Sequence, residues 1–179
     1  MLANQGAVFD DGLLESEKDD GAWAVEAVMV LPCPSHVDFE AMKTYYTDPE
    51  FSLNNLGEGL YGWMLKKERR HEDGMMRIAC TGYDPWFMSC FVQVPGGAKP
   101  VRTGRLRVHA NVPYAIYLNG EHVREPEREL VLKGGLNRLI AIVRGTGGDI
   151  AFGMTFLHAD GTYMKDLEYR MTLDEVEPK

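Results

Sequence analysis

Short apolar runs separated by turn residues dominate the chain after Tyr61. The clearest alternation covers residues 105–110, with apolar side chains on one face and Arg105, Arg107 and His109 on the other. About eight short strands at turn spacings of about ten residues are typical of an antiparallel sandwich whose sheets have one core face and one wet face. Strands are expected at 63–67, 76–81, 87–94, 105–110, 114–118, 122–123, 129–132, 138–144 and 150–158.

Glycine-rich turns separate these strands. Asn119-Gly120 is the strongest two-residue hairpin signal, because both residues tolerate the positive φ that a type I′ turn requires. Gly134 or Gly135 permits another tight reversal, and the side chain of Asn137 is expected to bond the backbone of that turn. Further turns are expected at 72–74, 95–97, 145–148 and 160–161.

The first third of the chain has a different pattern. Residues 23–31 form an apolar run that is stopped by prolines, which predicts a buried strand. A short helix is predicted around Phe39 to Tyr46, capped by Ser35 or Asp38, and a long loop follows it.

Two domain-level segments follow from these patterns. Residues 1–20 are acidic and poor in aromatics, which indicates a leader or linker. Residues 21–179 are expected to form one β-sandwich domain, with a first strand and long loop in 21–60 and the main sandwich in 61–172.

The composition is that of a chain with a sizeable core. Its 179 residues are 45% apolar and 26% charged, which excludes overall disorder, collagen and disulfide miniproteins. No apolar run approaches the roughly 18 residues that a membrane span needs, and residues 1–20 carry six acids and no signal-peptide core. The acidic ends suit a fragment of a longer protein, which would be extracellular or periplasmic as part of an exported enzyme. A free-standing chain would be cytoplasmic.

The net charge of −8 is unevenly distributed. Residues 1–60 hold twelve acids and two bases, residues 61–144 eight acids and fourteen bases, and residues 145–179 seven acids and three bases. The basic middle could bind an anionic partner, or it could be an exposed sheet face neutralised by the acidic ends. The second interpretation is favoured, with residues 1–60 lying partly against Arg105 and Arg107, because that face has no interleaved aromatics and no nucleic-acid motif.

Cysteines and histidines give no metal site. Cys33, Cys80 and Cys90 have no C-x-x-C spacing, and buried free thiols are favoured over a Cys80–Cys90 disulfide across a hairpin. The five histidines never fall at ligand spacing. The run Gly57 to Gly62 satisfies G-x-G-x-x-G, but it lacks the strand and helix that give this pattern its phosphate-binding mechanism.

The second half of the chain carries a family resemblance. The segments YLNGEHV (117–123), LVLKGGLNRL (130–139) and 147–156, ahead of Asp160-Gly161, resemble the galactose-binding-like jelly-roll module that is appended to many bacterial glycoside hydrolases and polysaccharide lyases. The resemblance implies an all-β, antiparallel jelly-roll sandwich with an irregular N-terminal extension. It also implies a non-catalytic accessory role, with a glycan or polysaccharide as ligand and an adjacent catalytic domain as partner. Modules of this kind often hold a structural calcium ion, while no other cofactor is expected.

A candidate glycan site lies in residues 83–87. An aromatic face covers the apolar side of a sugar ring while polar groups bond its hydroxyls, so Tyr83 and Trp86 could form a platform with Asp84 beside it. The alternative is that Trp86 folds inward and caps the sandwich. Tyr61 could line a cleft, or its loop could pack over a sheet.

Catalysis by this chain alone is not expected. Hydrolysis of a sugar needs two opposed carboxylates, and the sequence pairs none of its turn acids. No G-x-S-x-G or H-E-x-x-H motif occurs. The remaining hypotheses are a carbohydrate-binding module, a structural module that packs on a catalytic domain, and an enzyme whose carboxylate pair is brought together only by folding. The turn acids considered are Glu58, Asp84, Glu121 and Asp149.

Overall fold

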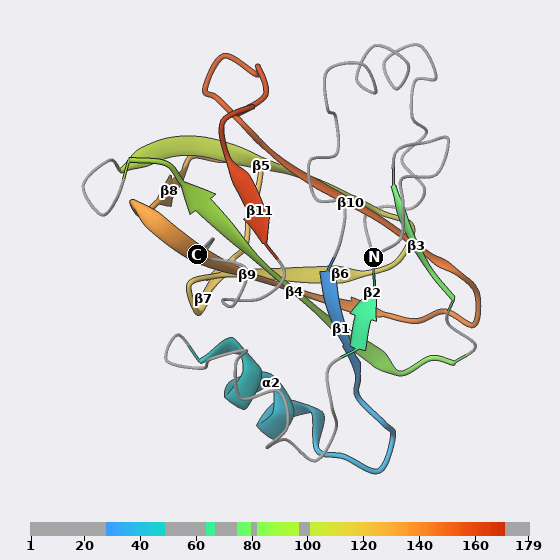
Figure 1. The fold of residues 1–179 in the computed structure, drawn as a ribbon. Helices are drawn as coiled ribbons and strands as arrows, with labels where there is room; N and C mark the ends of the chain where they lie inside the picture. The colour runs from blue at the N-terminus through green and yellow to red at the C-terminus, as the bar shows by residue number, and fades with distance from the viewer. Residues whose placement is uncertain (1–27, 49–63, 67–74, 80–81, 97–100, 171–179) are drawn as a thin grey trace.

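The computed structural model describes residues 28–48, 64–66, 75–79, 82–96 and 101–170. Within these ranges the chain forms two antiparallel sheets and one helix (Figure 1). Sheet A has the order β2 (Met64–Lys66), β1 (Val28–Pro32), β4 (Pro85–Val94), β9 (Gly135–Arg144), β6 (Tyr114–Leu118) and β7 (Glu121–Val123), and β11 (Glu168–Arg170) also pairs with β4. Sheet B has the order β3 (Met76–Ile78), β10 (Ile150–Leu157), β5 (Arg102–Ala110) and β8 (Leu130–Leu132).

The main core lies between the two sheets. Alternate residues of β4 and β9 point into it from sheet A, and Leu106, Phe152 and Phe156 meet them from sheet B. The predicted antiparallel β-sandwich is therefore confirmed. The fully buried core residues of β4 and β9 are Met88, Cys90, Val92, Val94, Leu139, Ala141 and Val143.

Helix α2 (Phe39–Thr47) covers the other face of sheet A, below the sheets in Figure 1. Met42 and Tyr46 of the helix pack against Phe87 and Ile142 of the sheet, and the rings of Tyr46 and Phe87 are 5.7 Å apart. Because both faces of its central strands are covered, sheet A contains continuous apolar runs instead of an alternating pattern. Within the described range 28–48, the strand and the helix that the sequence predicted are both present, as β1 and α2, where the family resemblance implied an irregular N-terminal extension.

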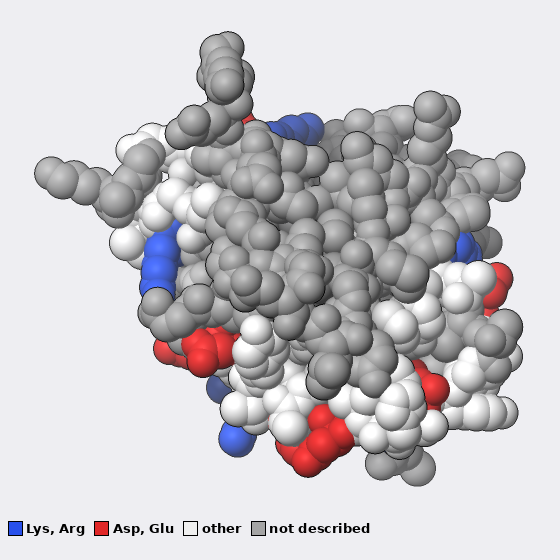
Figure 2. All heavy atoms as spheres, turned by 60° about the horizontal axis from the view of Figure 1, so that its bottom comes forward, with Lys and Arg blue, Asp and Glu red and all other residues white. Residues whose placement is uncertain are grey.

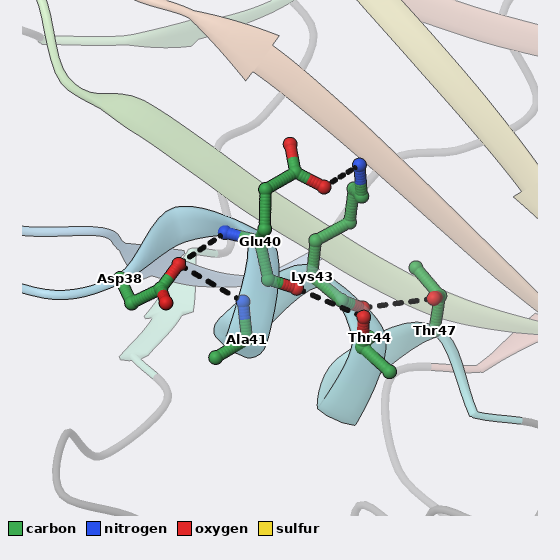
Figure 3. Close-up of polar contacts among 6 residues, drawn as sticks. All are labelled: Asp38, Glu40, Ala41, Lys43, Thr44 and Thr47. Carbon is green, nitrogen blue, oxygen red and sulfur yellow. Dashed lines mark hydrogen bonds and ion pairs between the residues drawn. The ribbon is translucent and has the colours of Figure 1, made fainter.

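The start of α2 is fixed by a local cap (Figure 3). Asp38 Oδ1 accepts hydrogen bonds from the backbone N–H groups of Glu40 at 2.9 Å and Ala41 at 3.2 Å. Lys43 forms an ion pair with Glu40 one turn away. The predicted helix and its Asp38 cap are therefore confirmed, since a side-chain acceptor satisfies amides that have no partner within the helix.

Two tight turns are held by asparagine side chains. Asn119 and Gly120 have φ values of 51° and 86°, as the β6–β7 hairpin turn requires, and Gly135 has a φ of 80°. Asn137 is fully buried, accepts from the backbone N–H of Lys133 at 2.9 Å and donates to the Lys133 carbonyl at 2.8 Å. The architectural interpretation of both asparagines is confirmed.

The outer face of β5 is only partly exposed to solvent, which corrects the prediction that Arg105, Arg107 and His109 all lie on a solvent-exposed face. Arg105 is exposed, but His109 is buried and Arg107 is half-buried. The Arg107 guanidinium donates to the Tyr163 hydroxyl at 3.1 Å and lies over its ring. A later segment covers this face because it returns along β10, where Tyr163 bridges to Leu157.

The described acidic residues near the N-terminus do not face the arginines of β5. Asp38, Glu40 and Asp48 lie in or beside α2, on the outer face of sheet A, whereas β5 belongs to sheet B. Arg102 of β5 instead forms an ion pair with Asp166 from the C-terminal side. On the face drawn in Figure 2, both basic and acidic side chains are visible among the described residues.

Other sequence expectations have mixed outcomes. β11 was not predicted, and β4 begins at Pro85, two residues before the start of the strand expected at 87–94. Cys33 and Cys90 are buried free thiols.

No helix in the described part of the chain is long and apolar enough to cross a membrane. Cys80, the glycine pattern at 57–62, the turn at 72–74 and residues 1–27 lie outside the described residues.

Candidate functional site

Loops from both sheets meet at the end of the sandwich where β4 begins. The ladder between β4 and β9 continues past Pro85 and Arg144, because Gly145 N–H donates to the Asp84 carbonyl at 3.2 Å. Gly147 N–H donates to the Gly82 carbonyl at 3.1 Å. The segment 82–84 and the β9–β10 turn are therefore held side by side at fixed spacing.

Tyr83 projects from this pair of loops. Its side chain is 74% exposed, the highest value among the large hydrophobic residues that the structure describes. The ring rests on Gly147, because a Cβ atom added there would lie 3.1 Å from the Tyr83 hydroxyl oxygen and 3.2 Å from Cζ. Gly147 also has a φ of 84°, which L side chains rarely adopt. A glycine thus provides both the turn and the bare surface that supports an exposed ring.

Asp84 lies beside Tyr83 and is half-buried. Its carboxylate approaches Gly82, since a Cβ added at that glycine would be 3.9 Å from Asp84 Oδ2. Burial first, and then the negative charges of Asp84 and Asp38, raise the pKa of the Cys33 thiol above its usual value.

Trp86 takes a different position from Tyr83. It is half-buried and packs against the core between the sheets, in register with Pro32 and Val143. Its indole packs inward against the core, as the alternative interpretation of the sequence described, and Tyr83 is the more exposed aromatic residue of this loop. Tyr61 lies outside the described residues.

The β5–β6 turn joins the same end. Asn111 Nδ2 donates to the Asp149 carbonyl at 2.9 Å, and Asn111 Oδ1 accepts from Ala151 N–H at 2.8 Å. These bonds anchor the end of the β9–β10 turn that supports Tyr83, and the same turn carries the exposed side chains of Thr146 and Asp149. The glycines of residues 145–148 predicted this turn, but the sequence did not indicate the contact between Tyr83 and Gly147.

The turn carboxylates are divided between the two ends of the sandwich. Asp84 and Asp149 lie at the end that carries Tyr83, while Glu121 follows the β6–β7 turn at the opposite end. Glu58 lies outside the described residues. Within the described ranges no group of three or more histidine, cysteine or carboxylate residues is placed to hold a metal ion.

The opposite end has a surface hollow of about 460 Å³ that the sequence did not indicate. It lies between the β6–β7 hairpin and β8, and its rim alternates acidic and basic side chains with one ion pair between Arg128 and Glu125. None of its lining residues is aromatic apart from His122, whose ring stacks on Tyr117 with centroids 5.0 Å apart. This hollow offers polar contacts but no exposed ring comparable to Tyr83.

The end that carries Tyr83 can therefore stack an apolar surface and accept hydrogen bonds beside it. Such a site favours a ligand with an apolar face and several hydroxyl groups. Comparisons of the chain with protein-family models, with curated proteins and with solved structures found no match.

Proposed function

We propose that the chain is a non-catalytic carbohydrate-binding module whose glycan stacks on Tyr83. The observation that carries the proposal is the exposed Tyr83 ring, held on the backbone of Gly147. An aromatic ring normally buries its large apolar area, so a rigidly supported ring in solvent suits a ligand contact.

The neighbouring polar groups complete a sugar site in this proposal. The Asp84 carboxylate accepts hydrogen bonds from sugar hydroxyls, and Thr146 and Asp149 offer further polar contacts from the supporting turn. Because the backbone hydrogen bonds between the two loops exist without ligand, little ordering is lost on binding.

An accessory role within a larger carbohydrate-active enzyme is part of the same proposal. It is supported by the resemblance of the segments around Asn119-Gly120 and Gly135 to Asn137 to galactose-binding-like modules. The confirmed sandwich and the positive φ values at those turns agree with that resemblance. The jelly-roll classification belongs to this proposal.

The test is a titration of the protein with a panel of neutral and acidic polysaccharides, measured by calorimetry and by affinity electrophoresis. At least one polysaccharide should bind the wild type, and Tyr83→Ala should weaken that binding about tenfold or more through loss of stacking. Tyr83→Phe should retain most of the affinity, because the ring remains.

Tyr45→Ala is the matched control, since Tyr45 is 52% exposed on α2 and belongs to neither of the two loops around Tyr83. It should leave binding unchanged. No binding to any polysaccharide, or equal losses in the Tyr83 and Tyr45 variants, would contradict the proposal and favour a module that only packs on another domain.

A further inference from the structure

Strand β8 forms a free edge of sheet B. It pairs with β5 through Leu132, Val131 and Leu130, and no other described strand pairs with it. Val131 at its centre is 52% exposed. Leu130, Val131 and Lys133 line the hollow of about 460 Å³, so this edge is open to solvent.

The edge is preformed. At one end, the Lys133 backbone is held by the side chain of buried Asn137 through hydrogen bonds of 2.9 and 2.8 Å. At the other end, Leu106 N–H donates to the Pro126 carbonyl at 2.9 Å, which ties the preceding loop to β5. A strand fixed in this way can accept another strand without further ordering.

Natural edge strands are usually protected by short length, charges, prolines or bulges, and β8 is short but has no charge or proline within its three residues. Here the centre is Leu-Val-Leu, and the neighbouring outer face adds Val101, which is 62% exposed. Two of the five large hydrophobic residues that are exposed in the described part of the chain therefore lie at this edge. An edge with this composition favours pairing.

The charges that flank β8 are self-complementary. The segment reads Glu129-Leu130-Val131-Leu132-Lys133, and both charged side chains are exposed. Among the described residues neither side chain has an ion-pair partner. Glu129, Val131 and Lys133 also have the same parity along the strand, so they lie on one face of the sheet.

We propose that two copies of the chain associate through β8, paired antiparallel about a twofold axis at Val131. This register places Glu129 of each copy opposite Lys133 of the other, on the face that carries Val131. It gives two identical ion pairs around a central apolar contact and joins two four-stranded sheets into one, as an isologous interface requires. This association is independent of glycan binding at Tyr83.

The test measures self-association of the full chain by analytical ultracentrifugation over a wide concentration range. The wild type should form a dimer whose dissociation constant rises with salt. Glu129→Lys and Lys133→Glu each turn two attractive pairs into two repulsive ones and should raise the dissociation constant about tenfold or more. The double exchange Glu129→Lys/Lys133→Glu restores both pairs in reverse and should recover dimerisation.

Two controls keep the result specific. Glu127→Lys changes an exposed charge of the adjacent loop outside the paired segment and should leave the dissociation constant unchanged. Thermal melts should show that every variant is folded. A wild type that stays monomeric at all concentrations, or a double exchange as weak as the single variants, would overturn the proposal.

Discussion

The side-chain amide of Asn119 donates a hydrogen bond to Asn137 Oδ1 at 2.9 Å, although eighteen positions separate the two residues. Asn119 Oδ1 in turn accepts from the backbone N–H of Arg138 at 2.9 Å. The β6–β7 and β8–β9 turns thus share one polar cluster, which stabilises both reversals at this end of the sandwich.

Replacing buried Asn137 by alanine should lower the free energy of unfolding by about 2–4 kcal/mol, because it removes a buried polar side chain and leaves part-buried groups of Lys133 and Asn119 without partners. Urea unfolding followed by circular dichroism measures this loss. Asn119→Gly is the matched comparison, since it keeps the positive φ and removes only the side-chain bonds. It should cost about 1 kcal/mol, and an Asn137 variant that costs no more than this would contradict the shared cluster.

Gly147→Ala should destabilise the fold by about 1–3 kcal/mol, because it strains a positive φ and pushes against the Tyr83 ring. Gly148→Ala is the control, since an added Cβ there meets nothing within 4 Å. Thermal unfolding compares the two variants. Combining Gly147→Ala with Tyr83→Ala should recover the steric part of the loss, and strictly additive effects would show that the ring does not rest on Gly147.

The ion pair between Arg102 and Asp166 should make a small contribution to stability that depends on pH. The hydrogen bond from Arg102 lowers the pKa of Asp166 below its ordinary value of 3.8. The contribution is therefore present above that value and is lost as the pH falls through the lower, folded-state pKa.

Because the pair is partly exposed, its contribution should stay below about 1 kcal/mol. Asp166→Asn should consequently lower the melting temperature slightly near neutral pH and not at all in strong acid. A constant difference between variant and wild type across this range would show that the carboxylate charge is not involved.

The Cys90 thiol should be inert in the folded protein. Burial raises its pKa to about 12, so the reactive thiolate is absent until the pH rises well above the ordinary value of 9.0. Alkylation followed by mass mapping should find Cys90 unmodified under native conditions and modified in urea. Rapid modification of the folded protein would contradict the position of Cys90 in the core.

Much of the fold could be predicted because its signals are local. The Asn119-Gly120 pair predicts its own turn, because both residues tolerate the positive φ that the turn requires. Asp38 likewise predicts the start of the helix that immediately follows it. β11 was missed because Glu168-Tyr169-Arg170 has no apolar pattern and depends on a free stretch of β4 edge beside β1. The covering of Arg107 by Tyr163 was missed for a similar reason, since the contact joins residues that are distant in sequence.

The candidate site could be predicted only in part. The sequence indicated the loop that contains Tyr83 and Asp84, but it left open whether Trp86 joins Tyr83 in an exposed platform or folds inward. Strand register places Trp86 opposite Val143, where it packs against the core, and that register depends on long-range pairing. The support from Gly147 likewise depends on two loops that folding brings together.

Helix α2 has a practical consequence for anyone who shortens the chain. The helix shields Phe87, Ile140 and Ile142 on the outer face of sheet A, and Leu31 of β1 belongs to the same cluster. A fragment that begins after Thr47 would lose both elements and present a broad apolar surface to water, together with a newly unpaired edge of β4. Such a fragment should aggregate during expression even though it contains the whole of sheet B.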